Sequence, residues 1–99
     1  MPSKPIKTPR FRIPEDIVSL IRNSHPELKR KIRAALEHIL ENPESGKTLK
    51  EELKGLRSYR VGRFRIIYRI SPKNTVEIVT IGPRRIIYEE TFRIIKRKN

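Results

Sequence analysis

The sequence contains no cysteine, only two histidines, and 11 acidic side chains against 24 lysines and arginines. Without cysteine, neither a disulfide framework nor a thiolate metal site can form, and two isolated histidines cannot make a zinc site on their own. We therefore expect a fold that is held together by packing and that uses no metal and no cofactor.

Long hydrophobic runs are also missing. No apolar stretch approaches the roughly 20 residues that a membrane-spanning helix needs, and the amino-terminal segment MPSKPIKTPR lacks the apolar core of a secretory signal. We expect a soluble, cytoplasmic protein with no membrane partner. A length of 99 residues suffices for one modest core but not for two, so residues 1–99 are expected to form a single domain.

The positive charge is concentrated in the second half of the chain. Residues 1–53 carry 11 basic and 8 acidic side chains, whereas residues 54–99 carry 13 basic and 3 acidic ones, out of a net charge of +13. Such a one-sided field repels itself unless a polyanion compensates it, for example a nucleic acid, an anionic lipid or an acidic protein. A solubilising surface is the simpler alternative, but solubility does not require the charge to gather in strand-like segments.

The first half of the sequence predicts an arm, an edge strand and two helices. Residues 1–9 alternate proline with basic residues and read as a flexible basic arm, and the alternation in RFRI at 10–13 is typical of a short edge strand. One helix is expected from Pro14 to about Asn23. A second is expected from Pro26 to about Asn42, because apolar residues recur there at helical spacing, at Leu28, Ile32, Ala35, Leu36, Ile39 and Leu40.

The second half predicts a sheet followed by a helix. Residues 57–62, 63–71 and 75–81 alternate basic with β-branched and aromatic residues and are separated by Gly62 and SPKN, which favours an antiparallel meander. In the middle strand one face is apolar, and the other carries Arg63, Arg65, Ile67 and Arg69. Gly82-Pro83 is expected to break the last strand, and IIYEETFRIIKRK returns to helical spacing. These elements predict an α+β fold: a small antiparallel sheet with an apolar face against an N-terminal helical hairpin, a basic opposite face, and a C-terminal helix.

Four arginines fall where the predicted strands meet. Arg60 and Arg65 flank the turn at Gly62, and Arg84 and Arg85 follow the last strand. Guanidinium groups gathered over one sheet face match phosphate oxygens and can stabilise charge that grows on phosphorus. The spacing alone leaves a merely solvated face equally open.

Two motifs carry a resemblance to a known family. LKGLRSYRVGRFRIIYRI, followed by VEIVTIGPRRIIYE, resembles the core of the RelE/ParE toxin superfamily of toxin–antitoxin systems. The resemblance implies the RelE-like fold just described, and an acidic antitoxin as partner in a hetero-oligomer. RelE-type members cleave messenger RNA in the ribosomal A site, by driving the 2′-hydroxyl onto its own 3′ phosphate, which blocks translation.

By position, the resemblance assigns roles to individual residues. Arg65 matches the phosphate-binding arginine of the strand, Arg84 the arginine after the last strand, and Arg60 a basic residue before the turn. Tyr88 matches a tyrosine that stacks on a base or accepts a proton, and with a reference pKa near 10 a tyrosine can accept one only if neighbouring arginines lower that value. Further contacts to RNA are expected from Arg85, Lys54, Arg63 and Arg57. The implied enzyme is a metal-independent endoribonuclease with ribosome and messenger RNA as partners.

The sequence departs from the family pattern at two positions. Many nuclease members have His where this chain has Pro83, and some have a second Lys where it has Ser58, so the resemblance assigns no general acid. His25 and His38 fall in the helical hairpin and are expected to be structural. Two other functions stay open: a ParE-like inhibitor of DNA gyrase without nuclease activity, and a non-catalytic module that binds nucleic acid.

Aromatic and acidic side chains outside this set receive structural roles. Tyr59 and Phe92 could stack on bases, but they occur at strand and helix spacings and are expected in the core. Glu89 and Glu90 are expected to cap or solvate the last helix.

Overall fold

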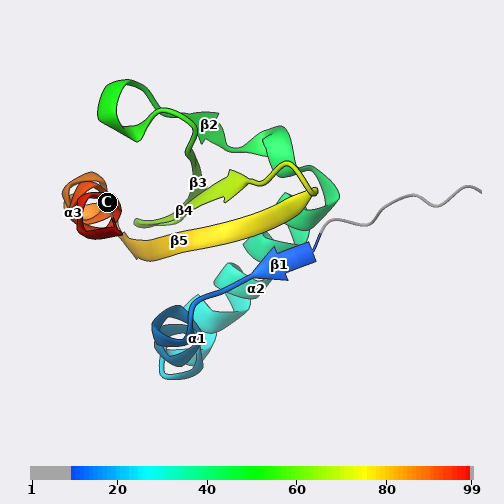
Figure 1. The fold of residues 1–99 in the computed structure, drawn as a ribbon. Helices are drawn as coiled ribbons and strands as arrows, with labels where there is room; N and C mark the ends of the chain where they lie inside the picture. The colour runs from blue at the N-terminus through cyan, green and yellow to red at the C-terminus, as the bar shows by residue number, and fades with distance from the viewer. Residues whose placement is uncertain (1–9, 99) are drawn as a thin grey trace, which may run out of the picture.

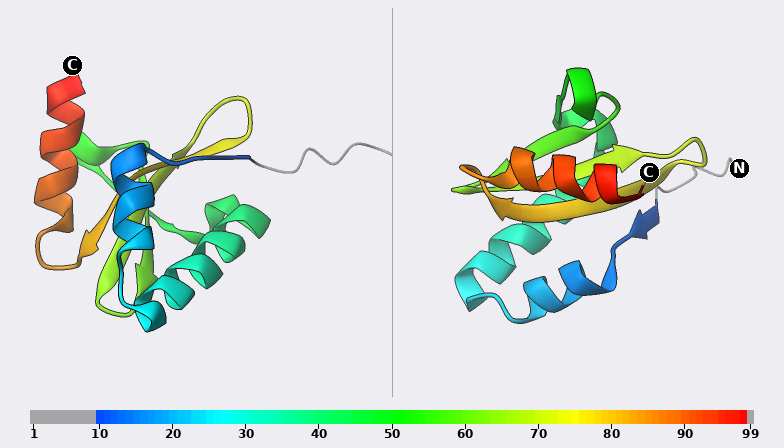
Figure 2. Two further views of the ribbon diagram at one scale, coloured as in Figure 1. Left: turned by 90° about the horizontal axis from the view of Figure 1, so that it is seen from below. Right: turned by 60° about the vertical axis from the view of Figure 1, so that its left-hand side comes forward.

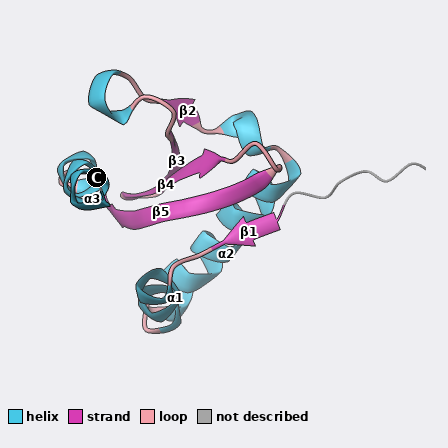
Figure 3. Ribbon diagram, viewed as in Figure 1, coloured by secondary structure: helices cyan, strands magenta, loops and turns pink. Residues whose placement is uncertain are grey.

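The structure, a computed structural model, describes residues 10–98, so the predicted basic arm at 1–9 lies outside the described residues. Five strands form one sheet in the order β1-β5-β4-β3-β2, and three helices pack on its two faces (Figures 1 and 3). In chain order the elements are β1 (Arg10–Arg12), α1 (Glu15–Arg22), α2 (Pro26–Glu41), β2 (Lys47–Thr48), β3 (Arg57–Val61), β4 (Phe64–Ile70), β5 (Thr75–Pro83) and α3 (Ile87–Lys98), with short 3₁₀ turns at Pro43–Ser45 and Glu51–Leu53.

The expected α+β class is confirmed, and the sheet is mixed instead of purely antiparallel. β3, β4 and β5 form the predicted antiparallel meander, but β1 pairs with β5 in parallel, with Phe11 opposite Val76. A three-residue strand carries no sign of its direction, which is set by a partner far along the chain. Two further differences are local: β2, for which no strand was predicted, pairs with β3, and β5 continues to Pro83, opposite Phe64, where a break was expected.

The two N-terminal helices begin and end where the sequence signals predict. Pro14 caps α1, and Glu15 and Asp16 in its first turn complement the helix dipole. At the start of α2, the Nδ1 of His25 accepts a hydrogen bond from the backbone N–H of Glu27 (3.2 Å). α2 ends just before Pro43, which cannot continue a helix.

A first core lies between these helices and the sheet. Ile17 of α1 and four residues of α2 pack against the apolar face of the meander, and all members are at most 9% exposed. The cluster consists of Ile17, Ile32, Ala35, Leu36, Ile39, Val61, Ile66, Tyr68, Val76, Ile78 and Ile81. Because each helix buries its apolar stripe on the sheet, this core fixes the strand register near the β3–β4 turn.

Tyr68 ties the first core to the loop after α2. It is fully buried, its hydroxyl donates to the carbonyl of Pro43 (2.7 Å), and it accepts from the N–H of Gly46 (2.9 Å). A Cβ at position 46 would lie 2.5 Å from the Tyr68 Oη, so only glycine fits there. Burial raises the pKa of Tyr68 above the usual value of 10.0, and the hydroxyl therefore stays protonated as a donor at neutral pH.

A second core lies on the opposite face of the sheet, beneath α3 (Figure 2). Leu56, Ile67 and Ile87 are buried there, with Leu49, Leu53, Val79, Tyr88 and Ile95 packed around them. The expectation of a basic face is therefore wrong for its centre and holds only at its two ends. Ile67 was the one apolar residue among the arginines of this face, and α3 covers that position.

Removing the Tyr68 hydroxyl should destabilise the fold. Tyr68→Phe leaves the Pro43 carbonyl and the Gly46 N–H without their buried partner, at a cost of about 1–3 kcal/mol. For a domain of this size that corresponds to a melting temperature lower by several degrees, measurable by circular dichroism. Tyr59→Phe is the matched control, because the Tyr59 hydroxyl bonds an exposed partner, His38. Equal melting temperatures for Tyr68→Phe and the unaltered protein would contradict this account of the loop.

Candidate functional site

The candidate site lies at the end of the sheet where the β3–β4 turn meets the start of α3. Gly62 adopts a positive φ of 59° in this turn, and Arg60 and Arg65 stand directly opposite each other across it. The backbone N–H of Arg84 donates to the carbonyl of Arg63 (2.8 Å). This bond joins the connection between β5 and α3 to the turn, so basic residues from two separate segments meet.

Arg65, Ser58 and Tyr88 form a hydrogen-bonded chain at the inner side of this site. The Nη1 of Arg65 donates to the Ser58 Oγ (3.1 Å), and the same Oγ lies 3.3 Å from the Tyr88 Oη. Ser58 is only 2% exposed. The three side chains come from β4, β3 and α3, so the contact exists only when α3 is seated on the sheet.

The guanidinium of Arg65 has one buried N–H that is not satisfied. Its Nε is shielded from solvent and has no hydrogen-bond partner among the described residues. Leaving a buried donor unpaired costs about 1–3 kcal/mol, and such groups in native structures call for an explanation, a functional role among them. The cation is thus held in place at a cost to the fold.

The arginines of the site are not neutralised by carboxylates. Within residues 10–98, the ion pairs join Glu77 to Arg12 and Arg69, and Arg93 to Glu89 and Glu90. None of them involves Arg60, Arg65, Arg84 or Arg85. The side chains of Arg60, Arg63, Arg84 and Arg85 are exposed around the half-buried Arg65. The end of the sheet is therefore a region of uncompensated positive charge, suited to an anion with several oxygens.

The structure brings most of the predicted site residues together and separates two of them. Arg60, Arg63, Arg65, Arg84, Arg85 and Tyr88 share the region just described. Arg57 lies at the other end of β3 and donates from Nη1 to the carbonyls of Glu44 and Gly46 (3.1 and 3.0 Å), which fixes the loop beside Tyr68. Lys54 is exposed in the turn that follows Glu51–Leu53.

The remaining candidate side chains have local partners, and one of them lies outside the core in which it was expected. His25 caps α2, and the Nδ1 of His38 lies 2.8 Å from the hydroxyl of Tyr59, which packs at the edge of the first core. Glu89 and Glu90 pair with Arg93 on the surface of α3. Phe92 was expected in the core but is 39% exposed, because it lies on the outer side of α3.

From the sequence, Ser58 was noted only as a position where some family members have a lysine, and it was not predicted to belong to the site. Strand alternation contains the signal that finds it. Ser58 is two residues before Arg60, so both side chains point to the same face of β3, and Arg65 is diagonal to Ser58 across the turn. The contact to Tyr88 could not be found in this way, since it depends on how α3 packs.

Neither a metal centre nor a membrane helix is evident in the part of the chain that the structure describes. Within residues 10–98, no three His, Asp or Glu side chains are grouped so that they could hold a metal ion. The same residues include no helix with the length and apolar character needed to cross a membrane.

Comparison with solved structures shows a shared fold. The chain is similar to a chain of the RelBE2 toxin–antitoxin complex from Mycobacterium tuberculosis, with 26% identity, a TM-score of 0.67, and coverage of 78% of this chain and 99% of the other. It is similar to a chain of the RelE–RelB complex from Pyrococcus horikoshii OT3 (23% identity, TM-score 0.64, coverage 78% and 96%). A free RelE toxin mutant from E. coli gives 17% identity, a TM-score of 0.70, and coverage of 91% and 97%.

Comparison of sequences identifies the family. No curated protein matches the chain significantly. A family model described as the ParE toxin of the type II toxin–antitoxin system parDE matches residues 10–88, which include the meander, Arg65, Ser58 and Tyr88. The superfamily indicated by the two sequence motifs is thereby confirmed, and the chain belongs to the ParE toxin family of type II toxin–antitoxin systems.

Proposed function

We propose that this toxin is a metal-independent endoribonuclease that cleaves messenger RNA on the ribosome. The observation that carries the proposal is the chain from Arg65 through Ser58 to Tyr88, which holds a cation and a phenol side by side at the uncompensated end of the sheet. A gyrase inhibitor or a simple binding module has no need of such a preorganised pair.

The reaction sets three requirements. The 2′-oxygen of a ribose attacks the adjacent phosphorus and loses its proton, negative charge accumulates on the phosphorane, and the 5′-oxygen leaves and takes up a proton. The products are a 2′,3′-cyclic phosphate and a 5′-hydroxyl. Arg65, with Arg60 and Arg84, supplies permanent cations for the second requirement. Cations that are already in place cost no reorganisation when the charge develops.

Tyr88 has two ways to contribute, and Ser58 positions it for both. Its ring can stack on a base, and its Oη, 3.3 Å from the Ser58 Oγ, can accept the proton of the 2′-hydroxyl when Tyr88 is in the phenolate form. Pro83 supplies no acid for the leaving oxygen, which takes its proton from water. Because the acid–base set is incomplete, we propose that the ribosome holds the RNA in the in-line geometry, and that free RNA survives.

The partner that silences this activity is proposed to be an acidic antitoxin. The complexes from Mycobacterium tuberculosis and Pyrococcus horikoshii are toxin–antitoxin complexes, and an acidic chain fits the charge of +13. Arg60, Arg63, Arg84 and Arg85 are exposed and uncompensated, which gives such a chain a site to cover.

A second candidate, inhibition of DNA gyrase, is favoured by one observation. The family model that matches is that of ParE toxins. A supercoiling assay with purified gyrase separates the two functions: inhibition of gyrase without cleavage of messenger RNA would replace the proposed function by this one.

Arg65→Ala and Arg84→Ala should each suppress cleavage far more than ribosome binding. A contact that acts when charge develops on the phosphate is worth about a hundredfold to a thousandfold in rate, whereas one charge among 24 contributes little to diffuse attraction. Single-turnover cleavage on programmed ribosomes and sedimentation binding measure the two quantities. Arg30→Ala, on the exposed side of α2, is the matched control and should change neither. Parallel losses of cleavage and binding would show that these arginines belong only to a general basic surface.

Substitutions at Tyr88 and Ser58 separate stacking from proton transfer. If Tyr88 accepts the proton, Tyr88→Phe should be nearly as damaging as Tyr88→Ala, and Ser58→Ala should lower the rate and alter its dependence on pH. If Tyr88 only stacks, Tyr88→Phe should be tolerated. The same single-turnover assay, run as a pH series, measures these outcomes. Full activity of Tyr88→Ala would exclude both roles.

Coexpression with the product of an adjacent acidic reading frame should yield a stable complex. Because the attraction is between opposite charges, the association rate should fall steeply as salt is raised, which surface plasmon resonance can follow. Arg60→Glu combined with Arg85→Glu should weaken the complex, whereas Arg30→Glu, with the same change of charge on α2, should weaken it much less. Failure of the two proteins to copurify would contradict the proposal.

A further inference from the structure

The outer side of α3 carries an exposed aromatic ring that belongs to neither core. Phe92 is 39% exposed and belongs to neither core cluster, while Ile87, Tyr88 and Ile95 of the same helix pack into the second core. One exposed apolar side chain is ordinary on a protein surface. Its neighbours make this one unusual.

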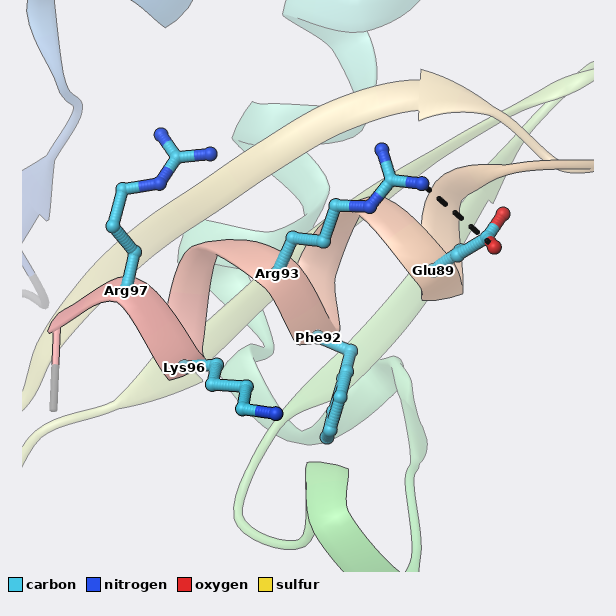
Figure 4. A pocket seen from close by; sticks show the side chains of 5 residues that line it. All are labelled: Glu89, Phe92, Arg93, Lys96 and Arg97. Carbon is cyan, nitrogen blue, oxygen red and sulfur yellow. Dashed lines mark ion pairs between the residues drawn. The ribbon is translucent and has the colours of Figure 1, made fainter.

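Two rows of side chains, one of them wholly basic, flank the exposed face of α3. Phe92 and Lys96 project to one side of the helix, and Arg93 and Arg97 project to the other (Figure 4). Together with Glu89 they line an open hollow of about 510 Å³. The Nζ of Lys96 lies 5.7 Å from the centroid of the Phe92 ring. The hollow therefore combines one flat apolar surface with three cations and a single carboxylate.

The ion pairs in this hollow are weak enough to be replaced. Arg93 approaches Glu89 at 3.8 Å and Glu90 at 3.9 Å, and the side chain of Arg93 is 62% exposed. Exposed pairs at such distances contribute little to stability, because water and salt screen them. A phosphate group can compete for Arg93 without a large loss to the fold.

The hollow continues the candidate site along the helix. Phe92 follows Tyr88 by four residues, so the two rings lie on the same side of α3, about 6 Å apart along its axis. Consecutive nucleotides of an unstacked single strand can span this distance. A strand bound at Arg65 and Tyr88 thus meets Phe92 as its next aromatic surface.

We propose that the outer face of α3 binds the single-stranded RNA next to the scissile nucleotide. One base stacks on Phe92, and the flanking phosphates contact Lys96, Arg93 and Arg97. An acidic helix would need an apolar groove for its own apolar face, and this hollow offers a single ring, which suits a base better. Because every base has a flat face, this binding should depend little on the RNA sequence. The proposal relies on the proposed function for the identity of the strand as messenger RNA.

The test measures binding with an RNA that cannot react. A fluorescein-labelled oligoribonucleotide of ten residues, 2′-O-methylated throughout, is titrated with the full-length protein, and fluorescence anisotropy gives the affinity. Phe92→Ala should weaken binding about fivefold to a hundredfold, the range of a lost base–aromatic stack. Phe92→Trp should preserve binding, and Phe92→Leu, which keeps apolar bulk without a ring, should behave like Phe92→Ala. Leu20→Ala, on α1, is the matched control, because Leu20 is 37% exposed and lies on the other side of the sheet.

A salt series separates the ring from the charges. Lys96→Ala should reduce the slope of log affinity against log salt by about 0.7, as expected for one lost phosphate contact to a single strand. Phe92→Ala should lower the affinity without changing the slope, and it should leave binding to a duplex of the same length unchanged, since paired bases cannot reach the ring.

Several results would overturn the proposal. The first is an unchanged RNA affinity for Phe92→Ala, and the second is an equal loss of RNA affinity for Leu20→Ala. The third is no measurable RNA binding by the unaltered protein at low salt. The fourth is that Phe92→Ala weakens binding of the acidic partner but not of RNA, which would make this face a protein interface. The readout is independent of cleavage. Failure of the nuclease assay therefore leaves this test intact, and failure here leaves the nuclease proposal intact.

Discussion

The packing of α3 over Ile67 is the contact on which the rest of the candidate site depends. Ile67, Ile87 and Leu56 are at most 4% exposed and form the centre of the second core. Burial of three such side chains contributes several kcal/mol. This contact places Tyr88 against Ser58 and Arg65, and it also decides which side of α3 faces solvent. Phe92 is exposed because it lies on the flank of the helix beside the core-facing residues Ile87 and Thr91.

The charge distribution is the second constraint. It destabilises the fold, whereas the packing of α3 stabilises it. Arginines gathered at one end of the sheet repel each other, and the buried Nε of Arg65 adds the cost of an unpaired donor. The two cores compensate for this cost. At the other end of the same face, Glu77 pairs with Arg12 and Arg69, so the fold neutralises positive charge where the site does not lie. At the site itself, Arg60, Arg84 and Arg85 are exposed and have no carboxylate partner within residues 10–98, so an anionic substrate or partner can reach them.

Much of the fold could be predicted from periodicity and turn residues, because these signals are local. The bounds of α1 and α2 and the pairing of Arg60 with Arg65 around Gly62 follow from them. Three features could not be predicted, because they arise from packing between distant segments. They are the direction of β1, the position of α3 on the sheet, and the contact of Ser58 with Tyr88. Phe92 was misjudged, and the position of Arg57 beside the loop after α2 was not foreseen, for the same reason: alternation and helical spacing do not reveal which loop or core a side chain meets.

The central claim is that the cluster of arginines and Tyr88 directs a ribose 2′-oxygen onto the adjacent phosphate. The most direct test uses programmed ribosomes and two messenger RNAs that differ only in one 2′-deoxynucleotide at the scissile position. The account predicts that the all-ribose message is cut, with a 2′,3′-cyclic phosphate and a 5′-hydroxyl at the new ends, and that the deoxy message stays intact. Cleavage of both messages would contradict the mechanism, and cleavage of neither, together with inhibition of gyrase, would contradict the assignment as a nuclease.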